Sequence, residues 1–333
     1  MKHLLSIADL ERRDIERVLD VAQSFAEVAD RDIKKVPTLR GRTVVNLFYE
    51  SSTRTSSSFE LAAKRLSADL ISIRSAGSAV DKGESLKDTI ATLSAYDPAA
   101  IVIRSPWAGA AEIVARNSSA SVVNAGDGKH EHPSQALLDL FTLMRHVKTL
   151  EGREIWIVGD VMHSRVARSN VLAFSRMGAR VTVAGPPTLI PRDFEALGCE
   201  IAYDLERVGE ADVIYALRMQ RERMGEADVI YALRMQHERM SPNENYVPSL
   251  REYVSCFQID SRRLQPRQLL MHPGPVNRGV ELSAEVIDSP QTLIADQVAS
   301  GVVVRMAILY ELLSAPSESP RSGSPAPTVV QPA

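Results

Sequence analysis

The 333-residue sequence has few cysteines, no excess of basic residues and no long apolar run. Cys199 and Cys256 are the only two cysteines and have no metal-binding spacing, which indicates a reduced environment. The 39 Lys and Arg are outnumbered by 42 Asp and Glu, so the net charge of −3 provides no overall positive field for nucleic acid or an anionic membrane. No uninterrupted apolar stretch approaches the roughly 18 residues that span a bilayer. Since Asp9 and Glu11 also make the N-terminal residues unlike a secretory signal, we expect a soluble, cytoplasmic protein without nucleic-acid or membrane partners.

The rest of the composition is typical of a globular protein, with 44% hydrophobic and 24% charged residues. At the usual domain size, the length corresponds to about two domains. Short apolar runs alternate with segments of helical periodicity. The expected strands are 43–48, 70–73, 100–103, 121–124, 154–158, 180–184, 200–202 and 213–217, and the expected helices are 7–29, 56–66, 85–96, 134–148, 164–177 and 292–313. This alternation predicts an α/β fold of two domains, each with a mostly parallel sheet flanked by helices.

The domain boundary is expected near Gly152. We therefore predict a first domain over 1–150 and a second over 151–291. Residues 292–313 form a C-terminal helix that we expect to pack back on the first domain. Residues 314–333 are rich in Pro and Ser and predict a disordered tail.

A tandem duplication lies in the second domain. Residues 209–224 (GEADVIYALRMQRERM) are followed directly by 225–240 (GEADVIYALRMQHERM), and the two copies differ only where Arg221 becomes His237. Two copies are too few for a solenoid, which needs three or more units, so we interpret the repeat as a recent duplication.

Polar residues follow three strands of the first half. The strand 43–48 leads to Ser51–Ser56, which contains Arg54, where a helix begins. Amides, hydroxyls and a guanidinium at a helix start favour phosphate, although a helix cap beside a solvated arginine is the alternative. Arg104 follows the strand 100–103, and His132 and Gln135 begin the next helix after 121–124. Because parallel sheets bind ligands beyond the carboxyl ends of their strands, these residues predict one anion site.

Two further segments in the second half carry candidate site residues. His163, Ser164 and Arg165 begin a helix after the strand 154–158, but Gly159 lacks the companions of a G-x-G-x-x-G motif, which excludes a nicotinamide site. The segment His272–Pro275 (HPGP) is either a rigid turn or a backbone lining of a cavity.

Seven segments occur in an order that resembles the aspartate carbamoyltransferase family. They are S-T-R-T-S-S-S-F-E, G-S-A-V-D-K-G-E-S-L, R-S-P, G-D-G-K-H-E-H-P-S-Q, G-D-V-M-H-S-R-V-A-R-S-N, L-R-M-Q-x-E-R-M and H-P-G-P. The similarity covers about residues 3 to 313. Related ornithine carbamoyltransferases typically carry H-C-L-P where this chain has H-P-G-P at His272.

The resemblance implies transfer of a carbamoyl group from carbamoyl phosphate to L-aspartate in pyrimidine biosynthesis, without a metal or organic cofactor. It makes residues 1–150 the carbamoyl phosphate-binding domain and 151–291 the aspartate-binding domain. Carbamoyl phosphate would contact Ser52, Thr53, Arg54, Thr55, Arg104, His132, Gln135, Pro273, Gly274 and Pro275. Aspartate would contact Lys82, Arg165 and the arginine and glutamine of the duplicated segment. Ser78 and Lys82 would come from a neighbouring subunit of a homotrimer, which can join a larger assembly with regulatory or dihydroorotase chains.

The implied catalytic residues are Arg54, Thr55, Lys82, Arg104 and His132. Fixed cations would bring two anionic substrates together in a site of low dielectric constant. Thr55, Arg104 and His132 would stabilise the charge that develops on the carbonyl oxygen, and Arg54 would hold the departing phosphate. We expect that phosphate to accept the amine proton.

The duplication departs from the family pattern, which has one such segment. Either Arg218 with Gln220 or Arg234 with Gln236 would hold the carboxylates of aspartate. We expect the duplicated chain to fold but to bind aspartate weakly or not at all, because the surplus apolar segment, if looped out, would lie beside a lid that must close over substrates. Two alternatives follow: an impaired homologue with a structural or regulatory role, and a carbamoyltransferase for another amino acid. A smaller departure is Ser105, where relatives often have histidine.

Overall fold

The first half of the chain forms a four-stranded parallel sheet with strand order β2-β1-β3-β4. The computed structural model describes residues 1–74, 84–217 and 249–314. The strands are β1 (Thr43–Phe48), β2 (Asp69–Arg74), β3 (Ala100–Ser105) and β4 (Ser121–Asp127). The helices are α1 (Arg12–Ala29), α2 (Thr53–Arg65), α3 (Leu86–Ser94), α4 (Ala110–Arg116) and α5 (Pro133–Val147).

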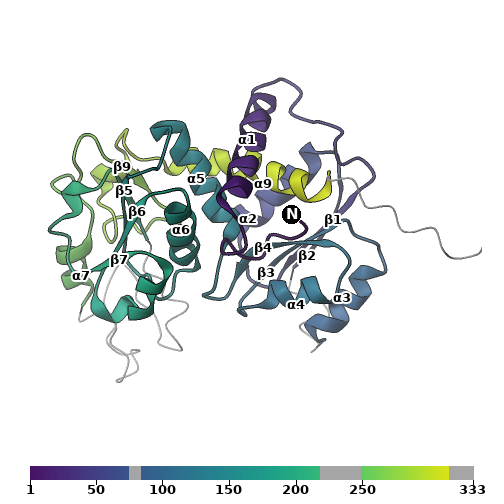
Figure 1. The fold of residues 1–333 in the computed structure, drawn as a ribbon, viewed down its shortest axis with the longest axis horizontal. Coiled ribbons are helices and arrows are strands. Elements are labelled where there is room, and N and C mark those ends of the chain that lie inside the picture. Colours follow the sequence, from purple (N-terminus) through teal and green to yellow (C-terminus); the bar gives the residue numbers. More distant parts are fainter. Residues whose placement is uncertain (75–83, 218–248, 315–333) are drawn as a thin grey trace, which may run out of the picture.

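The second half forms a five-stranded parallel sheet with strand order β7-β6-β5-β8-β9. The strands are β5 (Glu154–Val158), β6 (Arg180–Ala184), β7 (Glu200–Ala202), β8 (Val213–Ala216) and β9 (Leu269–Met271). The helices are α6 (Arg165–Arg176), α7 (Leu250–Phe257) and α8 (Ala284–Ile287), with short 3-10 turns at Pro187–Leu189, Arg192–Leu197 and Val208–Glu210. Figure 1 shows the two sheets side by side, with α5 running between the halves.

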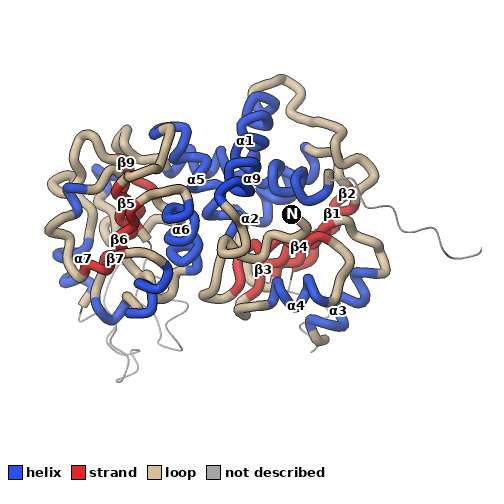
Figure 2. Tube along the Cα trace, in the orientation of Figure 1, coloured by secondary structure: helices blue, strands red, loops and turns tan. Residues whose placement is uncertain are grey.

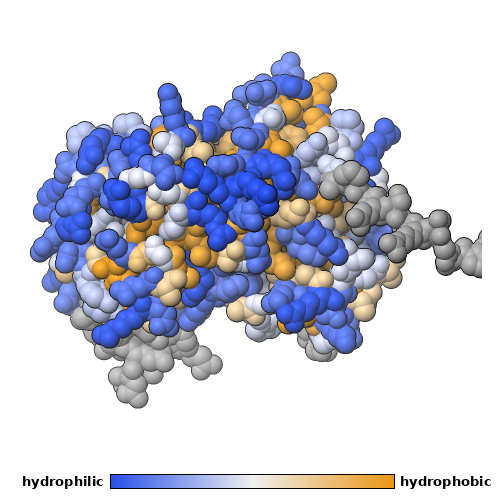
Figure 3. Space-filling view, viewed as in Figure 1, coloured by the Kyte–Doolittle hydropathy of each residue, from blue (hydrophilic) through white to orange (hydrophobic). Residues whose placement is uncertain are grey.

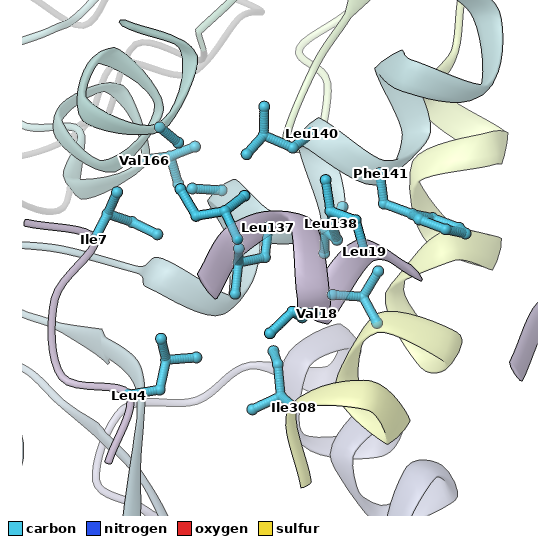
Figure 4. Packing of buried hydrophobic residues seen from close by; sticks show 14 of the residues in the cluster. Leu4, Ile7, Val18, Leu19, Leu137, Leu138, Leu140, Phe141, Val166 and Ile308 are labelled. Atoms are coloured by element: carbon cyan, nitrogen blue, oxygen red, sulfur yellow. The ribbon is translucent and has the colours of Figure 1, made fainter. Parts of the chain in front are cut away.

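The last helix, α9 (Ile294–Leu313), returns from the second sheet to the first half, where it packs against α1, α2 and α5 (Figure 2). Its centre is buried on nearly all sides, as expected for a helix with apolar residues around its whole circumference. In Figure 4, Ile308 of α9 lies near Val18 and Leu19 of α1, and Leu137 of α5 is close by. One apolar core therefore joins helices that are distant in sequence, and it also includes Val166 of α6.

The predicted fold class is confirmed: both sheets are parallel and flanked by helices. Several boundaries differ. The predicted helix 7–29 begins only at Arg12, because the Ser6 hydroxyl donates to Glu131 and Glu11 caps the helix instead. The predicted helices 56–66 and 292–313 begin at Thr53 and Ile294. The sequence patterns missed α4, α7, α8 and β9, which are short.

Hydrophilic residues cover most of the face in Figure 3. Within the three described ranges, no helix is long and apolar enough to cross a membrane. The C-terminal residues predicted to be a disordered tail lie outside the described residues from 315 onward.

Candidate active site

A cavity of about 790 Å³ lies where the carboxyl ends of the strands of both sheets meet α9. The first half contributes the segment after β1, the end of β3 and the start of α5. The second half contributes the start of α6, Leu217 after β8, and the HPGP segment. The predicted site residues that line it are Ser52, Thr53, Arg54, Thr55, Arg104, His132, Gln135, Arg165, Pro273, Gly274 and Pro275. All the predicted site residues that the structure describes are therefore brought together.

The start of α2 presents an anion-binding end to this cavity. Ser52 is the N-cap, and its hydroxyl accepts a hydrogen bond from the amide of Thr55 at 3.4 Å. The first turn of a helix carries amides that have no partner within the helix, and the positive end of the helix dipole also favours an anion. Arg54 in the same turn adds a full positive charge.

The HPGP segment lies directly against Arg54. A Cβ atom at Gly274 would stand 1.9 Å from Nη1 of Arg54, so only a glycine leaves room for the guanidinium in this position. The buried His272 holds the turn: its Nδ1 accepts from the amide of Gly274 at 2.7 Å, and its Nε2 lies 3.2 Å from the buried Glu281. The sequence left open whether this segment is only a rigid turn or also lines a cavity. In the structure, Pro273, Gly274 and Pro275 line the cavity.

Two arginines from different halves meet at Glu50. Nη2 of Arg104 lies 2.6 Å from Oε1 of Glu50, and Nη1 of Arg165 lies 3.1 Å from Oε2. Arg104 was expected just after its strand but belongs to β3 itself, whereas Arg165 begins α6 as predicted. Sequence reasoning missed Glu50, although its place two residues after the end of β1, just before the S-T-R-T segment, is the signal that could have found it.

The start of α5 places His132 and Gln135 at the cavity. His132 is the buried N-cap residue, its backbone amide donates to the Ser169 hydroxyl at 2.8 Å, and the Ser134 hydroxyl lies 3.3 Å from its Nδ1. When that hydroxyl donates to Nδ1, the ring carries its proton on Nε2 and can donate it to a ligand. Gln135 donates through Nε2 to Asp139 at 3.0 Å.

The described cavity lining is strongly cationic. It contains four arginines, Arg54, Arg104, Arg165 and Arg305, against one acidic residue, Glu50. Burial lowers the pKa of Arg305 to about 10, which still leaves it charged at neutral pH. Such a lining binds anions, and the surrounding amides and guanidinium groups suit phosphate and carboxylate oxygens. Among the described residues, no group of three His, Cys, Asp or Glu side chains could hold a metal ion.

Comparison with known proteins gives the family. Residues 2–145 match "Aspartate/ornithine carbamoyltransferase, carbamoyl-P binding domain", and residues 151–312 match "Aspartate/ornithine carbamoyltransferase, Asp/Orn binding domain". The chain belongs to the aspartate/ornithine carbamoyltransferase family.

Individual relatives of this carbamoyltransferase chain share most of its length. The aspartate carbamoyltransferase catalytic subunit of Salinispora arenicola is 52% identical over 320 residues, which cover 94% of this chain and 98% of that one. Aspartate transcarbamoylase from Trypanosoma cruzi in complex with carbamoyl phosphate superposes with a TM-score of 0.80 at 30% identity, covering 94% and 96% of the two chains. The same enzyme in complex with N-(phosphonacetyl)-L-aspartic acid gives a TM-score of 0.79 at 30% identity and the same coverage.

Several predicted site residues of the carbamoyltransferase chain lie outside the described residues. They are Ser78, Lys82, Arg218, Gln220, Arg234 and Gln236. Part of the first copy of the duplicated segment is described: Val213–Ala216 forms β8, which lies between β5 and β9 in the second sheet. His163, noted in the sequence, is buried and lies 2.9 Å from Asp160 through Nδ1, away from the cavity lining.

Proposed function

We propose that this chain is an aspartate carbamoyltransferase catalytic subunit, which transfers the carbamoyl group of carbamoyl phosphate to L-aspartate and releases phosphate. The observation that carries the proposal is the meeting of the S-T-R-T, H-P-S-Q and H-P-G-P segments with Arg104 and Arg165 around one cationic cavity. The 52% identity with a catalytic subunit of that name supports the choice of aspartate as the acceptor.

We assign the carbamoyl phosphate half of the cavity to the first domain. The phosphate would take the start of α2 with Ser52, Thr53, Arg54 and Thr55, where amides and a guanidinium stabilise its charge. The carbamoyl group would then lie between Arg104, His132 and Gln135, and the backbone of Pro273–Pro275 would close its other side.

We assign the aspartate half to Arg165 and to the first copy of the duplicated segment. Leu217, the last described residue of that copy, lines the cavity and is followed in sequence by Arg218 and Gln220. These two residues, instead of Arg234 and Gln236, would hold the carboxylates. The support is that the residues just before them, Val213–Ala216, form the strand β8 of the sheet.

The chemistry needs positioning and fixed positive charge and needs no covalent enzyme intermediate. Holding two reagents in place contributes roughly 7 to 11 kcal/mol to lowering the barrier. The neutral amine of aspartate attacks the carbamoyl carbon, and charge develops on the carbonyl oxygen. Thr55, Arg104 and His132 would stabilise that charge, Arg54 would hold the departing phosphate, and the phosphate takes the amine proton.

We also propose that the active unit is a homotrimer in the cytoplasm that serves pyrimidine biosynthesis. In it, Ser78 and Lys82 of a neighbouring subunit complete each site, and association with regulatory or dihydroorotase chains stays a prediction. Mixing two inactive variants, Lys82→Ala and His132→Ala, tests the shared site. Hybrid trimers should regain activity, because some of their sites receive both intact residues; no recovery after subunit exchange would contradict the sharing.

A direct assay tests the function. Purified protein is mixed with carbamoyl phosphate and L-aspartate, and both N-carbamoyl-L-aspartate and phosphate are measured. Equal amounts of the two products are expected, with no product when L-ornithine replaces aspartate. Carbamoylation of ornithine alone would overturn the choice of acceptor, and absence of both products, even after excision of residues 225–240, would overturn the function.

A further inference from the structure

The carboxylate of Asp139 lies at a junction of four structural elements. Asp139, on α5, has no exposed surface. Its Oδ1 accepts from Nε2 of Gln135 at 3.0 Å and from Nε2 of Gln297 at 2.6 Å. Its Oδ2 accepts from the Tyr215 hydroxyl at 2.6 Å and from Nδ2 of Asn170 at 3.0 Å. The carboxylate thus joins α5 to α9, β8 and α6.

This arrangement fixes which end of the Gln135 amide faces the cavity. An ionised carboxylate only accepts hydrogen bonds, so the end of Gln135 that meets Asp139 must be its NH₂ group. Positions i and i+4 of a helix are neighbours, which makes the contact local to α5. The oxygen Oε1 is then the end of the amide that is left for a ligand in the cavity, which Gln135 lines.

We infer that Asp139 is a positioning residue for substrate choice: by holding the NH₂ group of Gln135, it presents Oε1 as an acceptor that selects acyl phosphates bearing an N–H donor. This inference rests on the proposed function, because it refines how the carbamoyl group is recognised. A carbamoyl group has an NH₂ that can donate to Oε1, whereas the acetyl group of acetyl phosphate has a methyl group in that place. A site built around a hydrogen bond discriminates against a ligand that lacks the matching group.

The same carboxylate has a second pair of donors that do not involve Gln135. Of the two carboxylate oxygens, Tyr215 and Asn170 both bind Oδ2, and the Tyr215 hydroxyl also interacts with Asn170 and Gln297. Among the described residues, Oδ1 of Asn170 has no hydrogen-bond partner. An asparagine at position 139 can therefore keep its oxygen toward Gln135 and Gln297. Its NH₂ group would donate to the Tyr215 hydroxyl oxygen and to Oδ1 of Asn170 after a 180° flip of the Asn170 amide. To orient the Gln135 amide, position 139 has to provide an acceptor oxygen, but the negative charge of the Asp139 carboxylate is not required.

The experiment compares the dissociation constants of carbamoyl phosphate and acetyl phosphate by titration calorimetry. Asp139→Ala should raise the dissociation constant of carbamoyl phosphate about 10-fold and leave that of acetyl phosphate unchanged, because only carbamoyl phosphate donates a hydrogen bond to Oε1 of Gln135. Asp139→Asn should restore the wild-type ratio. In a double-mutant cycle, Asp139→Ala should add nothing to Gln135→Ala, since both remove the same hydrogen bond. Tyr215→Phe is the matched control, as it removes a donor from the other oxygen and should leave the ratio unchanged.

The outcomes separate this inference from the proposed function. Wild-type activity with both substrates tests the function, whereas the ratio of two binding constants tests Asp139 and requires no turnover. Three results would overturn the positioning role. Asp139→Ala could weaken the binding of both ligands equally, or its effect on carbamoyl phosphate binding could add to that of Gln135→Ala. Tyr215→Phe could also change the ratio of the two dissociation constants as much as Asp139→Ala does. If Asp139→Ala does not fold, Asp139→Ser takes its place, because its shorter side chain stays polar but ends one bond farther from Gln135.

Discussion

Glu50 and Arg165 form an ion pair that joins the two halves of the chain, with Nη1 of Arg165 3.1 Å from Oε2 of Glu50. The same carboxylate accepts from Nη2 of Arg104 at 2.6 Å. Arg165 is almost fully buried, so its charge depends on a nearby anion for compensation. One carboxylate thus sets the positions of two arginines that we assign to different substrates.

Glu50→Gln tests this arrangement. The amide keeps one acceptor but loses the negative charge, so both guanidinium groups should be less well positioned. We expect the KM for aspartate to rise by about 10-fold and kcat to fall, which corresponds to roughly 1.4 kcal/mol in substrate binding. Glu112→Gln is the control, because Glu112 pairs with Arg116 on the exposed surface, where such pairs contribute little. Unchanged kinetics in Glu50→Gln would contradict the positioning role.

Gly274→Ala should displace Arg54. The new methyl group would stand 1.9 Å from Nη1, and the flexible guanidinium is the part that can move. We expect the affinity for carbamoyl phosphate to fall by about 10-fold or more, since a charged hydrogen bond contributes roughly 1.5 to 3 kcal/mol.

The control for this substitution is Gly279→Ala. Both glycines have positive φ, +62° at Gly274 and +83° at Gly279, so alanine costs each about 1 to 2 kcal/mol of backbone strain. Of these two glycines, Gly274 alone has neighbouring atoms within 4 Å of the position of the added methyl group. Thermal melts should therefore shift in both variants, but binding should weaken only in Gly274→Ala. Equal weakening of binding would assign the effect to strain.

The alternation of apolar runs and helical periodicity predicted both sheets, because buried parallel strands leave a strong local pattern. Arg104, His132 and Arg165 were found as candidates because each lies near the carboxyl end of a strand. Short elements such as β9 and α8 carry too few residues for a periodic pattern. Glu50 was missed for another reason: the arginines that it holds, Arg104 and Arg165, are far away in sequence. Asp139 was missed because its contact with Gln135 depends on side-chain geometry that the helical pattern around 134–148 does not show.

The start of α1 illustrates how a distant contact overrides a local signal. The pattern predicted a helix from residue 7, but Ser6 donates to Glu131 and the helix begins only at Arg12. Leu4 meanwhile joins the edge of β4, with its amide 2.8 Å from the carbonyl oxygen of Val122. The first residues are therefore held as an extended segment, which the sequence near Ser6 does not reveal.

Removal of residues 225–240 should improve aspartate binding. The deletion leaves β8 in the first copy intact and restores a single segment after Leu217. Loop length itself costs little entropy, so the expected gain comes from removing an extra apolar segment that follows Arg218 and Gln220 in the sequence. We expect the KM for aspartate to fall by about 10-fold, the equivalent of roughly 1.4 kcal/mol, with no change in the affinity for carbamoyl phosphate. Steady-state kinetics measures both, and an unchanged KM for aspartate would remove the idea that the duplication impairs binding.

Asp139 should make stability depend on pH in a defined window. Burial raises its pKa from 3.8 to about 6, against the opposing effect of hydrogen bonds from Tyr215, Asn170, Gln297 and Gln135. A charged group that acts on Asp139 is the buried Arg305, whose positive charge the carboxylate favours. Because the folded pKa lies above the unfolded one, the stabilising contribution is fully present below about pH 4 and is lost as the pH rises through about 6.

Asp139→Asn removes this titration, so it isolates the contribution of Asp139 from that of every other acid. At roughly 1.4 kcal/mol per pKa unit, the free energy of unfolding of the wild type should fall relative to the variant by about 2 kcal/mol between pH 4 and pH 7. Urea unfolding of both proteins at several pH values measures the difference. A difference that stays constant over this range would mean that the four hydrogen bonds fully offset burial, and that Asp139 is ionised throughout.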